Sequence, residues 1–223
     1  MVIKTVTENI ALKELLKKTM QVMLKSSGAE RGVMVFNEKN EWYLKITGSN
    51  RREELEIQEN IPLTSQDKIP GTLVDHVIRR KKAVVLNDAR QENMFSDDAY
   101  ITLNKPLSIL CIPLMDQGEI VCVLYLENNL TRKVFSADKM ERLSLTGSLA
   151  ASCIKNVILS NRVQENMNTM THELKNPLMG IEYLLRDFVG RPGLSEEDQK
   201  LFSLGVEECQ LIKKLLKEIR QHQ

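Results

Sequence analysis

Hydrophobic positions follow two different patterns along the chain, and the change lies near residue 130. Before it, apolar residues recur at helical spacing over residues 8–25, and short runs rich in β-branched and aromatic side chains follow. These runs predict two antiparallel hairpins, with strands over 33–36 and 42–46 (turn 37–40) and over 107–114 and 120–126 (turn 116–118). The second pair of strands is almost continuously apolar, which is typical of strands covered on both faces.

The segment between the two hairpins carries weaker signals. A short helix is predicted over residues 72–80 and a short strand over 83–86, and residues 87–105 read as an irregular polar stretch. Loops that cover a sheet are common ligand sites, so we expect any pocket of this half to be covered by residues 61–106.

Strand signals stop after Phe135, and a long helix is predicted. Ser136 is a good N-cap, Asp138 is favourable in the first turn, and helical periodicity continues for about 50 residues until Gly190. A second helix begins after the turn, near Ser195. Apolar positions along the two helices are Leu143, Ala150, Ile154, Val157, Met167, Met170, Leu174, Leu178, Ile181, Leu185 and Phe188, then Leu201, Leu204, Leu211, Ile212, Leu215 and Ile219.

These two helices predict an antiparallel helical hairpin. One hairpin cannot bury its own apolar stripe, whereas two hairpins related by a two-fold axis form a four-helix bundle. We therefore expect a parallel homodimer through residues 136–223. The stripe is polar at Ser160, Asn161 and Gln164, which makes this place a hypothetical joint for a small rotation or bend.

Composition excludes several classes of protein. The 223 residues are 42% hydrophobic and 27% charged, with a net charge of +1, which argues against wholesale disorder and against a nucleic-acid binder. No secretory signal precedes the first helix, no stretch approaches the roughly 20 apolar residues of a membrane span, and a cytoplasmic location is expected.

The four cysteines form no Cys-x-x-Cys pair, so no metal site is predicted. Reduced thiols are expected, including a buried pair if Cys111 and Cys122 face each other across the second hairpin.

One segment carries specific chemistry: His172-Glu173-Leu174-Lys175-Asn176-Pro177-Leu178. It resembles the phosphoacceptor box of two-component sensor histidine kinases, which lies in the first helix of their dimerisation and histidine-phosphotransfer (HisKA) domain. The box is inside the predicted long helix, and a turn and second helix follow, as in that family. His76 and His222 have no such context and are expected to be ordinary surface or capping residues.

Phrases upstream of the long helix resemble a GAF sensor domain. They are residues 27–32, residues 108–114 and Leu124-Tyr125-Leu126-Glu127-Asn128, and Cys122 departs from the glycine that this family often has in its last core strand. The resemblances imply an α+β fold: a GAF domain, with an antiparallel sheet flanked by helices, over residues 1–135. A connecting signalling helix over 136–166, whose start packs on the GAF domain, then leads to the dimerising hairpin over 167–223.

The box implies a role for each of four residues. A neutral imidazole is a good nucleophile, so His172 is the expected phosphoacceptor, and Glu173 beside it would hold or remove the proton of the other ring nitrogen. By resemblance, Asn176 helps position water for dephosphorylation of a partner. Pro177 lacks an N–H and should kink the helix just after the histidine. The alternatives are that Glu173 is a surface carboxylate and that the kink is merely tolerated.

The ATP-binding domain of histidine kinases is missing from these residues, because no phosphate-cradling glycine loop is present. The chain alone should therefore neither bind ATP nor phosphorylate itself; ATP and Mg²⁺ belong to a separate catalytic domain. Further expected partners are a response regulator receiver domain and upstream sensor domains. A fragment of a longer kinase is favoured, and a stand-alone dimeric phosphotransfer protein or a non-enzymatic GAF adaptor is the alternative.

The ligand of the GAF domain is not readable from the residues. No Cys-His pair for a bilin is present, and only Phe135 and Asp138 remain of the cyclic-nucleotide signature. A purely structural GAF domain is as compatible with the sequence as a small-molecule sensor.

Overall fold

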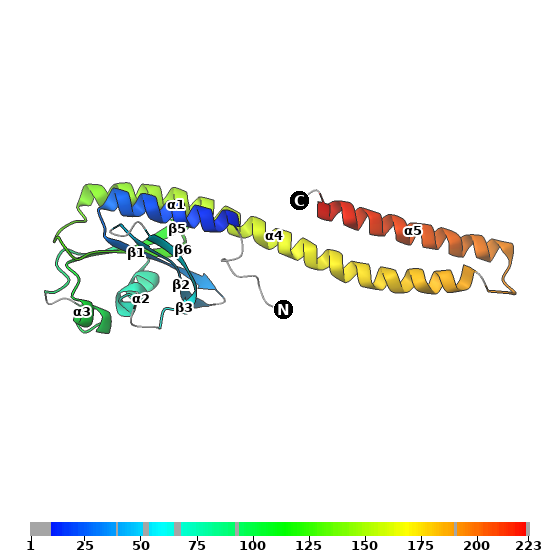
Figure 1. Cartoon of the computed structure of the whole chain (residues 1–223), viewed down its shortest axis with the longest axis horizontal. Coiled ribbons are helices and arrows are strands. Elements are labelled where there is room, and N and C mark those ends of the chain that lie inside the picture. The colour runs from blue at the N-terminus through cyan, green and yellow to red at the C-terminus, as the bar shows by residue number, and fades with distance from the viewer. Residues whose placement is uncertain are drawn as a thin grey trace. The chain divides into compact units, whose positions relative to one another are not determined.

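The computed structural model describes residues 10–38, 40–50, 54–64, 68–91, 94–189 and 191–221. The chain forms two compact units, Met1–Ile158 and Leu159–Gln223. The elements are, in order, α1 (Ile10–Ser27), β1 (Arg31–Glu38), β2 (Glu41–Ser49), β3 (Glu54–Pro62), α2 (Gly71–Arg80), β4 (Val84–Leu86), α3 (Ala99–Asn104), β5 (Ser108–Asp116), β6 (Glu119–Asn128), α4 (Ala137–Val189) and α5 (Glu196–Gln221) (Figure 1).

A six-stranded antiparallel sheet forms the centre of the first unit, with the order β3-β2-β1-β6-β5-β4. Both predicted hairpins are confirmed as β1–β2 and β5–β6. The turn of the second hairpin places Gln117 and Gly118 at φ 49° and 82°, a pair of left-handed residues that matches the twist of the flanking strands. The sequence thus located the turn correctly.

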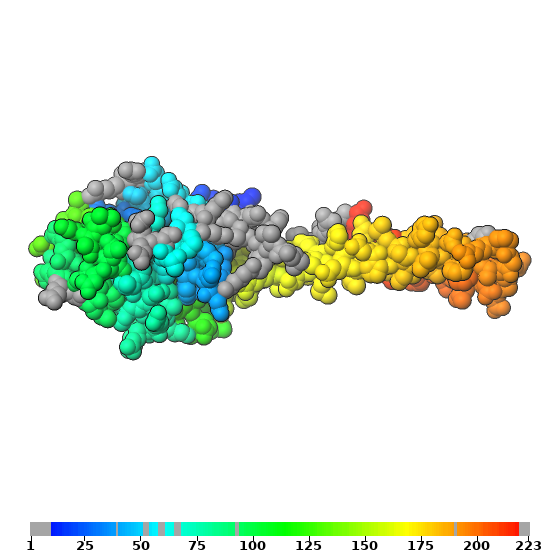
Figure 2. Space-filling model, turned by 90° about the horizontal axis from the view of Figure 1, so that it is seen from below, coloured from blue at the N-terminus to red at the C-terminus, as the bar shows by residue number. Residues whose placement is uncertain are grey.

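Helices cover both faces of this sheet. In Figure 1, α1 and the first part of α4 lie on one face, and α2 and α3 lie on the other, which Figure 2 views from outside. Alternate residues of β6 supply the two cores: Cys122, Leu124 and Leu126 point toward α1 and α4, whereas Val123 and Tyr125 point toward α2 and α3. The inference that the second hairpin is covered on both faces is therefore confirmed.

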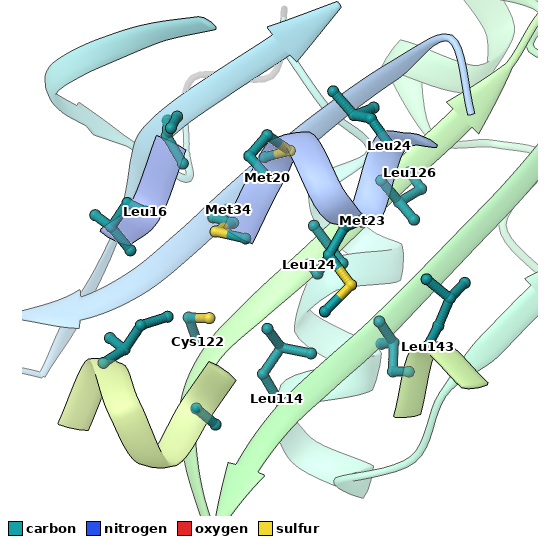
Figure 3. Packing of buried hydrophobic residues seen from close by; sticks show 14 of the residues in the cluster. Leu16, Met20, Met23, Leu24, Met34, Leu114, Cys122, Leu124, Leu126 and Leu143 are labelled. Atoms are coloured by element: carbon teal, nitrogen blue, oxygen red, sulfur yellow. The ribbon is translucent and has the colours of Figure 1, made fainter. Parts of the chain in front are cut away.

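The core beneath α1 and α4 is built from methionine and leucine side chains. Figure 3 shows Met20, Met23 and Leu24 of α1 packed with Met34, Leu124 and Leu126 of the sheet. All of these side chains are almost fully buried. Unbranched Met side chains fill irregular gaps, which explains their number better than metal ligation does.

The first part of α4 belongs to this core. Leu143, Gly147, Ala151 and Ile154 are buried at spacings of four, four and three residues. A Cβ on Gly147 would lie 2.6 Å from Leu114 Cδ2, so glycine allows the helix this close to the sheet. The buried position is thus Ala151, not the predicted Ala150.

Polar contacts also attach α4 to the sheet. Lys155 Nζ and Ser152 Oγ contact the Asp116 carboxylate at the end of β5, at 2.7 and 2.5 Å. The expected GAF boundary at residue 135 therefore falls before a helical segment that packs on the sheet.

Two elements, β3 and α3, are not predicted by the local sequence pattern. The first four residues of β3 alternate polar and apolar, and Leu55 and Ile57 pack against the core. The polar residues 58–60 that follow are more typical of a loop than of a strand. α3 has six residues, and its signal is an N-cap, Asp98, whose side chain accepts a hydrogen bond from the Tyr100 amide. Both elements occupy stretches that we had read as irregular or had left unassigned.

The expected facing of Cys111 and Cys122 is wrong. Cys111 pairs with Tyr125 and Cys122 with Leu114 in the β5–β6 register. Cys111 lies in the core under α2, and Cys122 lies in the core under α1. The two thiols are therefore on opposite faces of the sheet, because side chains alternate along a strand.

The second unit contains the end of α4 and all of α5. Phe188 and Phe202 stack with ring centroids 5.1 Å apart, and Val206 and Cys209 of α5 are buried. Ser195 caps α5 by accepting a hydrogen bond from the Asp198 amide at 3.1 Å. The predicted helical hairpin is thus present.

Candidate functional site

The predicted site residues lie together on α4, within the second unit. The helix has 53 residues and runs through Pro177 without interruption. His172, Glu173 and Asn176 are all exposed. Asn176 follows His172 by about 40° around the helix, so these two side chains share a face, whereas Glu173 is about 100° away.

The imidazole of His172 is accessible to a partner. Among the described residues, no hydrogen bond or ion pair involves its side chain, and neighbouring Thr171 donates its hydroxyl hydrogen bond to the Met167 carbonyl instead. An exposed imidazole can act as a nucleophile, and an adjacent carboxylate can accept its proton. The His172 imidazole and the Glu173 carboxylate each extend separately from the helix.

Pro177 changes the backbone next to the site. Because proline has no N–H, the carbonyl of Glu173, four residues earlier, lacks its usual helical hydrogen bond. The helix nevertheless continues to Val189, and the predicted kink stays a prediction.

A second face of the same hairpin is apolar and exposed. Met170, Leu174 and Ile181 are 61%, 49% and 49% exposed, and they lie about 160–200° around the helix from His172. α5 adds exposed leucine and isoleucine side chains: Leu201, Leu204, Leu211, Ile212 and Leu215. We call these eight residues the exposed stripe. On α4, His172 lies on the opposite side of the helix from the residues of the stripe.

The first unit contains a buried polar cluster that sequence analysis did not predict. Glu127 Oε2 accepts hydrogen bonds from Tyr100 Oη at 2.7 Å and from Tyr125 Oη at 2.6 Å. Arg31 Nη1 lies 3.3 Å from Glu127 Oε1 and donates to Tyr100 Oη at 2.9 Å. We call Arg31, Tyr100, Tyr125 and Glu127 the Glu127 cluster.

Burial and charge set the protonation of this cluster. Burial, and then the negative charge of Glu127, raise the pKa of Tyr100 and of Tyr125 well above the ordinary range. Burial lowers the pKa of Arg31, but Glu127 and the tyrosines outweigh it, so that the pKa is raised. Both phenols therefore stay protonated and donate to the carboxylate. Arg31 and Glu127 are cross-strand partners in β1 and β6, a pairing that the sheet register alone reveals.

An open, polar depression of about 420 Å³ lies beside this cluster. Its lining comes from residues 30–31, 47–49, 54, 56, 127 and 129, at one end of strands β1, β2, β3 and β6. None of these residues falls in the stretch 61–106 that we had expected to cover a pocket.

No group of three or more His, Cys, Asp or Glu side chains in the part of the chain that the structure describes could hold a metal ion. Burial raises the pKa of the Cys111 and Cys122 thiols, which keeps them protonated.

By length and composition alone, one described helix, α4, could cross a membrane. Helices that pack in a protein core pass the same test, and Leu143, Ala151 and Ile154 of α4 are buried. The test therefore shows no membrane span.

Comparison with known proteins identifies the first unit. Residues 11–154 match the GAF domain family. The chain belongs to the GAF domain family. Among solved structures, the GAF domain of a two-component sensor histidine kinase from Bacillus halodurans superposes with a TM-score of 0.52 at 18% identity, covering 69% of this chain and 99% of that one. The GAF domain of an Acinetobacter phosphoenolpyruvate-protein phosphotransferase superposes with a TM-score of 0.51 at 16% identity, covering 70% of this chain and 90% of that one. At these identities, the likeness shows the GAF fold alone.

Three curated relatives of this GAF protein are histidine kinases. Hybrid signal transduction histidine kinase G of Dictyostelium discoideum is 31% identical over 128 residues, which is 48% of this chain and 4% of the relative. Peroxide stress-activated histidine kinase mak3 of Schizosaccharomyces pombe is 27% identical over 175 residues, 77% of this chain and 7% of the relative. Histidine protein kinase 1 of Candida albicans is 30% identical over 129 residues, which is 56% of this chain and 5% of the relative. The chain thus spans less than a tenth of the length of each relative.

Proposed function

We propose that this chain is the sensory and phosphoacceptor region of a two-component histidine kinase. The GAF domain receives a signal, and the hairpin of α4 and α5 is a dimerisation and phosphotransfer (HisKA) domain with His172 as phosphoacceptor. The observation that carries the proposal is an exposed histidine inside the segment 172–178, on a long helix that turns back into α5. The histidine kinase relatives support it.

The chemistry assigns a task to each side chain. A ring nitrogen of His172 attacks the γ-phosphorus of ATP; a nitrogen–phosphorus bond forms, the phosphorus–oxygen bond to ADP breaks, and ADP leaves. Glu173 takes or holds the proton of the other ring nitrogen. Asn176, on the same face as His172, orients water when the phosphate of a partner is hydrolysed.

Three partners follow from this assignment. A separate domain supplies ATP and Mg²⁺, and a receiver domain of a response regulator takes the phosphoryl group from His172. A second copy of this chain covers the exposed stripe, because apolar residues at helical spacing in both helices suit a four-helix bundle. We expect a cytoplasmic location, as the sequence predicts, and domains upstream of the GAF domain are compatible with the proposal.

The decisive experiment supplies the ATP-binding domain of a histidine kinase in trans with radiolabelled ATP and Mg²⁺. Acid-labile label should appear on the wild-type chain and be absent from His172→Gln. Glu173→Gln should slow labelling without abolishing it, because the acceptor nitrogen remains. His76→Gln, in α2 of the GAF domain, is the matched control and should be labelled normally.

Other results would decide against the proposal. Label that survives His172→Gln would mean that another residue is the acceptor. A wild-type chain that dimerises but is not labelled by the ATP-binding domains of several relatives would instead indicate a non-enzymatic GAF adaptor.

A further inference from the structure

α3 is weakly attached to the GAF domain except at one end. It has six residues, too few for a helix to be stable by itself. Only Tyr100 and Ile101 are buried, at 6% and 3% exposure, whereas Leu103 is 77% exposed. The helix ends at Lys105, which adopts a left-handed conformation with φ 47°. The attachment therefore depends on a few side chains near the start of α3.

Two polar contacts hold that start. Asp98 Oδ2 accepts hydrogen bonds from Thr72 Oγ1 at 2.6 Å and from the Thr72 amide at 3.0 Å, which joins α3 to the first turn of α2. Tyr100 Oη donates to Glu127 Oε2 at 2.7 Å, which joins α3 to the end of β6. The first contact connects two covering elements. Among the described residues, the Tyr100 hydroxyl is the group of α3 that is hydrogen-bonded to the sheet, because it also accepts a hydrogen bond from Arg31 Nη1 of β1 at 2.9 Å.

The Glu127 cluster tolerates the loss of Tyr100. Without that hydroxyl, Glu127 keeps Arg31 at 3.3 Å and Tyr125 at 2.6 Å, and Arg31 still donates to the Lys68 carbonyl at 2.7 Å. Leaving a buried charge without a partner would cost far more than losing one hydrogen bond. Here Arg31 and Glu127 each keep a partner. α3 can therefore leave the sheet without disrupting the rest of the Glu127 cluster.

We propose that α3 is a releasable cover on the α2 face of the GAF sheet, closed by the hydrogen bonds that the Tyr100 hydroxyl donates to Glu127 and accepts from Arg31. Asp98 remains bonded to α2 when the cover opens and acts as its hinge. Opening exposes the Tyr125 hydroxyl and the Glu127 carboxylate, which are almost fully buried when α3 is in place. This inference does not depend on the phosphoacceptor role of His172.

Hydrogen exchange measured by mass spectrometry on the full chain tests the cover. Tyr100→Phe keeps the ring and removes only the hydroxyl. Amides of α3 should then exchange at least about tenfold faster, because the variant loses the hydrogen bonds of the hydroxyl with the charged groups of Glu127 and Arg31. Amides of β5 and β6 should keep their wild-type rates, because the core beneath remains closed.

Tyr43→Phe is the matched control. Tyr43 also donates a hydrogen bond to a glutamate, Glu41, but on the exposed β1–β2 hairpin. The Tyr43→Phe variant should leave hydrogen exchange in α3 unchanged. Unchanged α3 exchange in Tyr100→Phe would overturn the proposal, and so would an equal rise across all strands, since that would make the hydroxyl a support of global stability.

A second variant distinguishes the role of Asp98, the hinge, from that of Tyr100, which closes the cover. Asp98→Asn weakens the contact to Thr72 while keeping the size of the side chain. If Asp98 is the hinge, exchange should rise both in α3 and in the first turn of α2, whereas Tyr100→Phe should affect α3 alone. Identical exchange patterns in the two variants would contradict this division.

Discussion

The GAF domain buries apolar side chains on both faces of its sheet, whereas the hairpin of α4 and α5 leaves most of its large apolar side chains exposed. Leu124 in β6 is 0% exposed, while Ile181 in α4 is 49% exposed. A sheet with helices on both sides closes its own cores. Two helices alone cannot enclose a core, so apolar side chains beside their seam stay exposed. We therefore expect the GAF domain to be stable by itself and the hairpin to be stabilised by the proposed second copy.

A core truncation should have the largest effect and should be confined to the GAF domain. Leu124→Ala removes a fully buried side chain, so the free energy of unfolding should fall by about 2–5 kcal/mol. Urea unfolding followed by fluorescence of Trp42, the one tryptophan of the chain, measures it. Leu174→Ala, half exposed in the hairpin, should leave this transition unchanged, and an equal shift would remove the contrast between the two units.

A charge in the exposed stripe should act on assembly instead. Ile181→Asp should raise the dissociation constant of the proposed homodimer about 100-fold, because a carboxylate would have to be desolvated in the interface. Sedimentation velocity across a concentration series measures the constant. Tyr183→Asp is the control: Tyr183 is 74% exposed but lies about 20° from His172 around the helix, off the stripe. A wild-type chain that stays monomeric at micromolar concentration would contradict the dimer.

Two glycines of α4 offer an intermediate test. A Cβ on Gly147 would meet Leu114, so Gly147→Ala should destabilise the GAF domain by about 1–3 kcal/mol in the Trp42 assay. Nothing lies within 4 Å of a Cβ on Gly180, and Gly180→Ala should stabilise its helix by up to about 1 kcal/mol, seen as a higher melting temperature by circular dichroism. Similar effects from both substitutions would show that α4 packs no more closely in the GAF domain than in the hairpin.

Acid should produce the smallest effect, in the hairpin. Hydrogen bonds from Lys213 and then Arg186 lower the pKa of Glu182 to about 2. A carboxylate with a depressed folded pKa adds stability above its unfolded pKa of about 4.3, and that stability is lost as the pH falls toward 2. Helicity should therefore decrease between pH 4.5 and 2 in the wild type and vary less in Glu182→Gln. A Glu182→Gln profile identical to the wild type would show that this contact contributes nothing.

Local patterns in the sequence were sufficient for much of the molecule. Runs rich in β-branched and aromatic residues located β1, β2, β5 and β6, and N-cap residues located the starts of α4 and α5. The box containing His172 was found because its seven residues are contiguous. β3 and α3 were missed, since an edge strand rich in glutamate and a helix of six residues have weak local signals.

By itself, the sequence determined the two-part organisation, the long helix and the position of His172 within it, because helical periodicity and short motifs depend on neighbours only a few residues apart. Only the tertiary structure decided which residues meet across the sheet. Arg31, Tyr100 and Glu127 are separated by 69 and 27 residues, and they converge because β1 pairs with β6 and the Tyr100 hydroxyl of α3 reaches both strands. The same register put Cys111 and Cys122 on opposite faces. Strand pairing is long-range, and a shift of one residue reverses every side chain, so local pattern could not specify it.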